Sequence, residues 1–292
     1  MSTVTLGVDV SDLIASLAIV RGSEVVASGI VAANRPAAIK DAAKKALASA
    51  GGTLSGIAIA QATATEDVAE DLRAALTAVA PKCPHHLIAA GQAAAIAEQS
   101  RGAAIGASQL IAFSIAEHVT AGVLINGTPW LGAHGLASSI GWLALNPVER
   151  EDYRRYGSLE AEVAAAGIVR RFVWRIKSGD RSRVADQVNG DFSKITAADI
   201  LQGARAGDGV AISVVRDTAK YIGMAVANLA TLFDPEAIVL GGIIASSGDI
   251  MFDAIKTEAH RRLLPQQAEQ VRIVLSTLGD DAVAMGAALA HS

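Results

Sequence analysis

The chain has 292 residues, of which 51% are hydrophobic and 18% are charged. This composition excludes disorder over most of the chain, because disordered segments are poor in apolar residues and rich in charge. The formal net charge of −4 gives no global electrostatic argument for nucleic-acid binding. The apolar stretches are interrupted by polar residues before they reach the ~20 residues of a membrane span, so no membrane partner is expected.

The N-terminal residues lack a basic segment and carry Asp9 and Asp12 early, so no signal peptide is expected. The single cysteine, Cys83, excludes an internal disulfide and any site with several cysteine ligands. Together these features predict a cytoplasmic, soluble α/β protein.

Hydrophobic periodicity predicts five strands and three helices in the first hundred residues. The strands are expected over 4–8, 14–20, 24–31, 54–60 and 86–89, and the helices over 37–50, 66–79 and 92–99. The first helix is expected to end at Gly51, a residue type that tolerates the backbone conformation of a helix C-terminus.

The rest of the chain is predicted to be mainly helical. The expected strands are 109–115, 119–125, 128–131, 237–240 and 271–275, and the expected helices are 159–177, 197–206, 209–233, 249–263 and 282–290. The helix over 209–233 has the strongest pattern, because apolar residues recur every three or four positions from Ile212 to Phe233.

The opening strand–loop–strand–turn–strand pattern occurs twice. Aligning the turn residues Gly22 and Gly127 gives an offset of 105 residues. At that offset Asp9 matches Ser114 and Asp12 matches Glu117. We therefore expect a duplicated α/β unit, and the alternative is two unrelated hairpins.

Four motifs resemble the ROK family (repressor, open reading frame, kinase), in the sugar-kinase branch of the actin-like ATPase superfamily. They are residues 228–242, with Phe-Asp-Pro-Glu, a buried strand and a glycine turn; Leu131 to Trp142; Gly157-Ser-Leu-Glu160; and Asp281 to Ala288. The resemblance implies two RNase-H-like domains with an interdomain cleft, and a homodimer. It places one lobe over 1–105 and the other over 106–280, with the final helix, 281–292, packed on the first lobe.

The residue that would act as a base departs from the family's pattern. The family's catalytic aspartate follows an asparagine just before an alanine-rich helix, and this pair falls on Ala89 and Ala90. Phosphoryl transfer to a sugar hydroxyl needs a positioned proton acceptor, which alanine cannot supply. Gln92 lies nearby but cannot act as a base. No catalytic residue is therefore assigned.

The sugar and zinc positions depart as well. The family's Glu-x-Gly-His motif falls on Ser139 to Trp142, and Ser158 stands where the family has a zinc cysteine. Because a structural zinc needs four soft or imidazole ligands, no zinc or other metal is expected. The Trp142 side chain is expected to project into the former sugar pocket and fill it.

The phosphate loops lack their glycines. Asp-x-Gly-Gly-Thr is replaced by the sequence from Asp9 to Leu13, and Gly-Thr-Gly-x-Gly by Ala116 to Thr120. Side chains there hinder the approach of phosphates to backbone N–H groups, and Asp12 and Glu117 add negative charge. The nucleotide-binding candidates that remain are Asp9, Gly241 and Gly242, where the two glycines are equally explained by a strand-to-helix turn.

These departures favour a non-catalytic, pseudokinase-like protein that binds a small molecule or a protein partner. The candidate cleft residues are Asp12, Gln92, Glu117, His118, His134, Ser139 and Trp142. The alternative is an atypical kinase that uses Mg-ATP to phosphorylate a hexose or amino sugar, with His86, Asp9 or Asp12 as base. No cofactor is assigned outside this alternative. A sugar-responsive repressor is disfavoured, because no helix-turn-helix pattern precedes the first strand.

A basic run stands apart from these motifs. Residues 169–183 carry six basic side chains and one acid. We expect a solvated helix face followed by a loop, and the alternative is a site for an anion or a partner.

Overall fold

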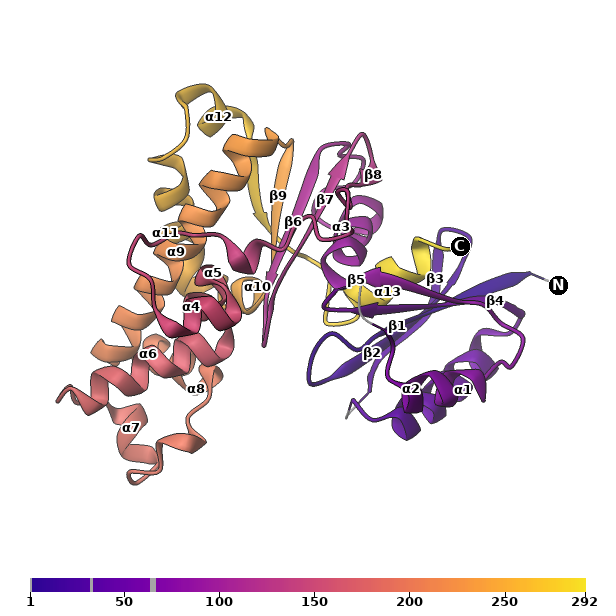
Figure 1. Cartoon of the computed structure of the whole chain (residues 1–292), viewed down its shortest axis with the longest axis horizontal. Helices are drawn as coiled ribbons and strands as arrows, with labels where there is room; N and C mark the ends of the chain where they lie inside the picture. Colours follow the sequence, from indigo (N-terminus) through magenta and orange to yellow (C-terminus); the bar gives the residue numbers. More distant parts are fainter. Residues whose placement is uncertain (1, 32–33, 64–66) are drawn as a thin grey trace. The chain divides into compact units, whose positions relative to one another are not determined.

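The computed structural model describes residues 2–31, 34–63 and 67–292, in which two five-stranded sheets alternate with helices (Figure 1). The first sheet has the order β3-β2-β1-β4-β5 and the second the order β10-β9-β6-β7-β8. The strands are β1 (Thr3–Asp9), β2 (Ala15–Arg21), β3 (Glu24–Val31), β4 (Thr53–Gln61), β5 (His85–Ala89), β6 (Leu110–Ile115), β7 (Val119–Ile125), β8 (Thr128–Pro129), β9 (Ala237–Gly242) and β10 (Arg272–Leu275). Read from β8, the second sheet repeats the order of the first, as the repeat at Gly22 and Gly127 predicts.

Most helices of the described residues follow the sixth strand. They are α1 (Pro36–Ala50), α2 (Glu70–Thr77), α3 (Ala90–Arg101), α4 (Glu151–Tyr156), α5 (Ser158–Val163), α6 (Ala165–Lys177), α7 (Arg183–Gln187), α8 (Ala197–Arg205), α9 (Gly209–Phe233), α10 (Ile243–Ser246), α11 (Gly248–His260), α12 (Pro265–Gln270) and α13 (Ala282–Leu289), with short 3₁₀ turns at Ile140–Trp142 and Phe192–Lys194. Among all the residues that the structure describes, no helix is long and apolar enough to cross a membrane.

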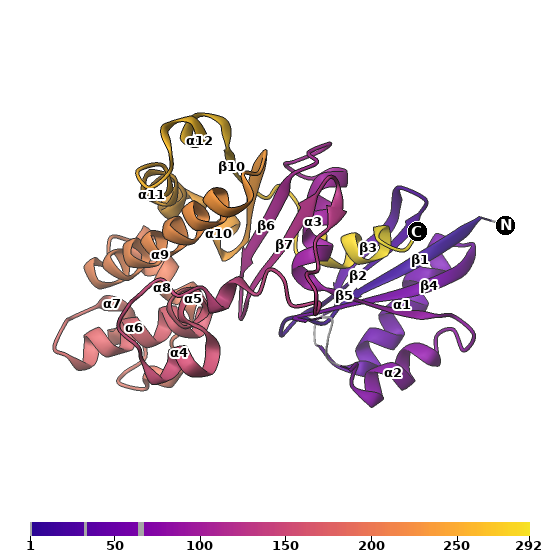
Figure 2. The ribbon, with the colours of Figure 1, turned by 45° about the horizontal axis from the view of Figure 1, so that its top comes forward.

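The chain divides into two units. Unit 1 comprises Met1–Phe113, Thr120–Ser138 and Ser276–Ser292, and unit 2 comprises Ser114–Val119 and Ser139–Leu275. In unit 1, α1 and α2 cover one face of the first sheet through buried side chains such as Ile39 and Leu76. Helix α13 packs on β1, β2 and β4 at the other face (Figure 2).

Glycines set the distance between α13 and its neighbours. A Cβ atom on Gly7 of β1 would lie 1.9 Å from the carbonyl oxygen of Ala284, and one on Gly286 would lie 1.8 Å from that of Ala93 in α3. Any side chain at these positions would push the backbones apart. The helix therefore contacts the sheet and α3 backbone to backbone.

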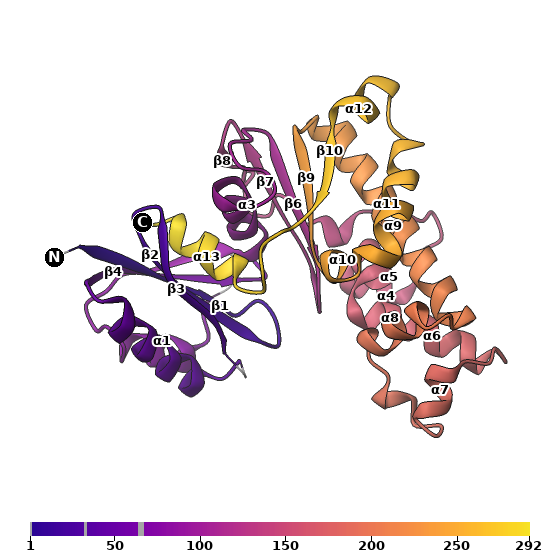
Figure 3. The ribbon, with the colours of Figure 1, turned by 180° about the vertical axis from the view of Figure 1, so that it is seen from behind.

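Unit 2 is organised around α9, which packs against α8 and α11 (Figure 3). Asp208 caps the start of α9 by accepting a hydrogen bond from the Ala211 N–H at 2.9 Å. The apolar stripe predicted for this helix is buried from Val215 to Leu229. At its ends the prediction is wrong, because Ile212 is 37% exposed and Phe233 is only half-buried.

Other predicted elements differ from the structure. The helix predicted over 159–177 is broken at Ala164, whose ψ of 160° is extended, and forms α5 and α6. The break lets α6 pack against α5, since a Cβ on Gly167 would lie 2.4 Å from the Ala161 carbonyl oxygen. The helix predicted over 66–79 begins at Glu70, and its predicted first residue, Glu66, lies outside the described residues.

We expect Gly7→Ala to lower the free energy of unfolding by about 1–3 kcal/mol, because the added methyl group overlaps the Ala284 carbonyl. Gly29→Ala is the matched control in strand β3, since nothing lies within 4 Å of the Cβ position there. Urea unfolding of both variants measures the difference. Equal midpoints would contradict the backbone contact.

Candidate functional site

The carboxyl ends of three parallel strands form the first group of candidate residues. Strand β1 pairs with β4 and β4 with β5, so that Asp9 lies opposite Ala60 and Gln61 opposite Ala89. In open α/β sheets, ligands bind outside the carboxyl ends of the strands. The sequence-predicted residues Asp9 and Ala90 thus belong to the same edge of unit 1.

Asp9 is a buried acid at this edge, with 6% of its surface exposed. Its Oδ1 accepts hydrogen bonds from the backbone N–H of Ser11 at 2.9 Å and from the Ser11 hydroxyl at 2.6 Å. Burial raises the pKa of the Asp9 carboxyl, the hydrogen bonds from Ser11 oppose that effect, and the nearby charge of Asp12 adds to it. The fold thus holds a carboxylate where desolvation disfavours its charge.

Ala90 begins α3 and is buried, with 1% of its surface exposed. Two strand spacings, about 10 Å, separate the end of β1 from the end of β5. A general base must lie within hydrogen-bond reach of the proton that it accepts. The carboxylate of Asp9 therefore does not replace an acid at position 90.

Gln92, in the first turn of α3, is 2% exposed. Its Nε2 donates a hydrogen bond to the carbonyl oxygen of Trp130 at 3.1 Å, within unit 1. Its Oε1 is buried and accepts no hydrogen bond from the described residues. Gln92 therefore holds the segment at Trp130.

Two other candidates lie on loops of unit 1. Asp12 is half-exposed; its carboxylate accepts the Leu13 N–H at 2.7 Å, and its carbonyl oxygen accepts a hydrogen bond from the Asn34 side chain at 2.7 Å. Asp9 and Asp12 thus share one loop. His134 is exposed on the separate loop that follows β8.

A polar cluster in unit 2 joins His118 to Glu160, a residue that the sequence analysis did not select. The Nδ1 atom of His118 lies 3.1 Å from Glu160 Oε1, and the Val119 N–H donates to Glu160 Oε2 at 3.2 Å. The Glu160 side chain is 20% exposed and that of His118 55% exposed. A carboxylate and an imidazole that it orients can together bind a hydroxyl group of a ligand, or accept the proton of that hydroxyl.

The sequence did contain a signal for Glu160. It is the last residue of the Gly-Ser-Leu-Glu element, which served only to establish the resemblance. The absence of a side chain at Gly141 lets the Glu160 carboxylate lie close to the loop that contains Gly141, since a Cβ at that position would lie 3.0 Å from Glu160 Oε2.

The remaining candidates of unit 2 are exposed. They are Glu117, Ser139 and Trp142. The Trp142 backbone N–H donates to the Ser139 carbonyl oxygen at 3.1 Å. The residue Trp142 is 59% exposed to solvent. Trp142 is therefore not enclosed by a pocket.

Gly241 and Gly242 end β9 against the last residues of β6. A Cβ on Gly242 would lie 2.1 Å from the Ile115 carbonyl oxygen, and one on Gly241 would lie 3.1 Å from Ser114 Oγ. Gly242 also has a φ of 62°, which L side chains rarely adopt. This packing accounts for both glycines, and their contact with a nucleotide stays a prediction.

Comparison with known proteins gives a consistent family. The ROK family model matches residues 36–292. A glucokinase from Halalkalibacterium halodurans is 33% identical over 198 residues, which cover 66% of this chain and 59% of that protein. A xylose repressor from Caldicellulosiruptor bescii is 27% identical over 185 residues, covering 61% of this chain and 45% of the repressor. The chain thus spans about half the length of these relatives.

Solved structures extend the similarity over the whole fold. The crystal structure of a ROK family glucokinase from Streptomyces griseus, in complex with glucose and AMPPNP, aligns with a TM-score of 0.77 and 25% identity. The alignment covers 98% of each chain. A ROK hexokinase from Thermus thermophilus has the same fold, with a TM-score of 0.77 at 22% identity. Both sheets therefore belong to the two-domain, actin-like arrangement.

We expect Asp9→Asn to raise the free energy of unfolding at neutral pH. The pKa of Asp9 is higher in the folded chain, so the wild type loses stability as pH rises from about 4 towards that raised value. The amide can accept the same hydrogen bonds and carries no charge. Urea unfolding at several pH values should give a difference that narrows towards acid pH.

The control is Asp41→Asn, which changes an exposed acid on α1. It should leave stability the same across this pH range. A gain from Asp9→Asn that persists undiminished below pH 4 would contradict the role assigned to the buried charge.

Proposed function

This chain belongs to the ROK family, and we propose that it is a non-catalytic member that binds a small ligand. One observation supports the proposal: Ala90 is buried at the carboxyl edge of the first sheet, and the motif resemblance places the family's catalytic acid at this position. Asp9 belongs to the same edge but lies about 10 Å away along the sheet. The proton of a substrate hydroxyl therefore has no acceptor at this position.

The loop after β1 supports the proposal independently. Phosphate groups bind where successive backbone N–H groups are open to them. Here the Ser11 N–H donates to Asp9 and the Leu13 N–H donates to Asp12, so the loop's own carboxylates occupy these donors. A polyphosphate would have to displace two like-charged groups.

The ligand that we propose carries hydroxyl groups. Glu160 and His118 form a fixed acceptor and donor pair in unit 2, and both retain surface open to solvent. The glucokinase from Streptomyces griseus, crystallised with glucose, and the xylose repressor connect the family with sugars by their descriptions. A sugar or related polyol fits this chemistry.

An atypical ATP-dependent sugar kinase is the second candidate, with Mg-ATP as its cofactor. The buried carboxylate of Asp9 and the retained turn at Gly241 and Gly242 favour it. His86 does not serve as its base, because it lies near the amino end of β5, three residues or about 10 Å from Ala89. Its ring instead stacks on that of His291, with centroids 4.3 Å apart.

Three further properties are proposed from family membership. The chain acts in the cytoplasm, forms a homodimer, and divides into lobes 1–105 and 106–280 with residues 281–292 packed on the first. The proposed partners are a small ligand or another protein, and neither nucleic acid nor a membrane.

We expect one or more sugars to bind without any phosphoryl transfer from ATP. In a thermal-unfolding screen of hexoses and amino sugars, a ligand at 100 times its Kd adds about 2.7 kcal/mol to the free energy of unfolding. His118→Gln should weaken this effect, because the pair with Glu160 is lost. His134→Gln, which changes an exposed loop histidine of unit 1, is the control.

Turnover separates the two candidate functions. The non-catalytic assignment would be overturned if the wild-type chain phosphorylates any hexose or amino sugar with ATP and the Gly242→Trp variant does not. If calorimetry detects no binding of Mg-ATP at millimolar nucleotide, the proposal of an atypical sugar kinase is excluded.

A further inference from the structure

A cavity of about 720 Å³ lies within unit 2, between α6, α9 and the segment that precedes α4. Three of its lining residues, Arg170, Arg171 and Arg175, come from the basic run expected to be a solvated helix face. Arg150 and Lys220 add two more cations. The three arginines of α6 thus line a cavity together with a lysine of α9. The prediction that they form a solvated helix face is wrong for these three side chains.

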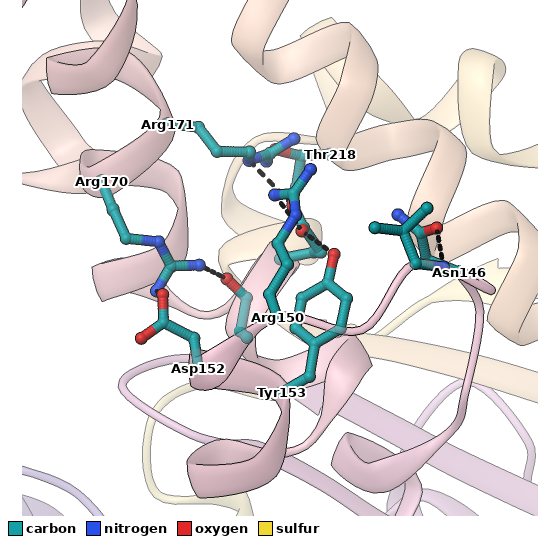
Figure 4. Close-up of polar contacts among 10 residues, drawn as sticks. Asn146, Arg150, Asp152, Tyr153, Arg170, Arg171 and Thr218 are labelled. Carbon is teal, nitrogen blue, oxygen red and sulfur yellow. Dashed lines mark hydrogen bonds and ion pairs between the residues drawn. The ribbon is translucent and has the colours of Figure 1, made fainter.

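Glu162 organises the inner wall of this cavity. Its side chain is 1% exposed and accepts hydrogen bonds from Arg150 Nη1 at 3.2 Å and from the Tyr153 hydroxyl. The Nε atom of Arg171 lies 3.6 Å from its other oxygen. One buried carboxylate thus faces two guanidinium groups, those of Arg150 and Arg171; Figure 4 shows these two arginines beside Tyr153 and Thr218.

The inner arginine, Arg171, is mostly buried, with 16% of its side chain exposed. Arg171 donates to the hydroxyl of Thr218, and its guanidinium carbon lies 5.9 Å from the centre of the Tyr221 ring. Burial lowers the pKa of Arg171, and the charges of Glu162 and Asp217 oppose this effect. The inner wall is therefore preorganised and positive before any ligand arrives.

At the cavity mouth each cation pairs with an acid, and the excess of one positive charge around the whole cavity comes from Arg150 and Arg171 against Glu162. Arg170 pairs with Asp152 at 3.1 Å and Arg175 with Asp180 at 2.6 Å, and both acids approach from outside the lining. Lys220 pairs with Asp217 at 3.2 Å. Among the described residues, five cations therefore meet four acids around this cavity, two of the acids being outside it.

Donors remain available for a ligand. A guanidinium carries five N–H groups, and Arg150 uses one of them, to Glu162, among the described residues, while 54% of its side chain is exposed. The side chains of Arg170 and Lys220 are 39% and 53% exposed. Arginine forks of this kind bind carboxylates and phosphates with two parallel hydrogen bonds.

The rest of the lining is apolar or aromatic. It consists of Leu145, Trp174, Val214, Tyr221 and Met224. Trp174 is 69% exposed, which leaves a large indole surface beside the cations. A ligand for this cavity should therefore combine an anionic group with an apolar body.

We propose that this cavity is a binding site for a small organic anion that has an aromatic or apolar body. The anionic group lies among Arg150, Arg170 and Lys220, and the apolar body packs against Trp174 and Tyr221. The site is built entirely from unit 2 residues other than His118, Glu160 and the glycine turn. It does not depend on whether the chain binds or phosphorylates a sugar.

Calorimetry with four compounds tests this proposal. They are 1-naphthyl phosphate, 1-naphthoate, the neutral 1-naphthol and inorganic phosphate. We expect the two naphthyl anions to bind one per chain, at least tenfold more tightly than 1-naphthol or phosphate alone, and more weakly as salt concentration rises. The ratio of the first two affinities distinguishes a phosphate site from a carboxylate site.

Variants locate the binding. Lys220→Gln and Arg170→Gln should each weaken binding of the preferred naphthyl anion about tenfold, and both change side chains outside the buried pair of Glu162 and Arg171. Arg205→Gln is the matched control, because it removes an arginine of the same unit that pairs with Asp249 away from the cavity. It should leave the affinity the same. Thermal unfolding confirms that each variant is folded.

Three results would overturn the proposal. They are binding of 1-naphthol as tight as that of the anions, no binding of either anion, and equal effects of the cavity and control variants. A loss of dimer on Arg170→Gln or Lys220→Gln, without any anion binding, would assign this face to a second copy of the chain instead.

Discussion

The close approach of helix backbones to strand backbones is the constraint on which unit 1 depends. Helix α13 contacts β1 at Gly7 and α3 at Gly286, and in both places a single methyl group would overlap a carbonyl oxygen. Helix α3 in turn contacts β7, because a Cβ on Gly91 would lie 2.0 Å from the Ala121 carbonyl. Buried alanines beside these contacts, among them Ala93, Ala284 and Ala287, have side chains small enough to leave the backbones this close.

Hydrophobic periodicity predicted most of the fold, because burial imposes it on long elements. Helix α9 was predicted to the residue, and the strands to within one or two residues. The strand expected over 128–131 ends two residues early, at Pro129. The break at Ala164 could not be predicted, since both flanking segments are good helix sequences and only packing separates them. Short helices such as α4 and α12 bury too few residues to leave a pattern.

The sequence also indicated part of the candidate site. The family motifs identified the positions of Asp9 and Ala90, and the pairing of β1, β4 and β5 in the structure shows that both belong to one sheet edge. The contact between His118 and Glu160 could not be predicted, because 42 residues separate them and only the fold brings them together. The basic cavity was missed for the same reason. Its cations come from α6, α9 and the segment before α4, and a helical pattern describes one helix at a time.

The order of segments along the chain has a consequence for synthesis. Helix α13, which covers one face of the first sheet, follows every residue of unit 2 in the sequence. A growing chain therefore carries β1 to β5 with that face uncovered until residues 282–289 leave the ribosome. Contacts between such distant segments form slowly, and exposed apolar surface in the interim promotes aggregation. Translation of the intervening unit sets the time for which the nascent sheet needs protection.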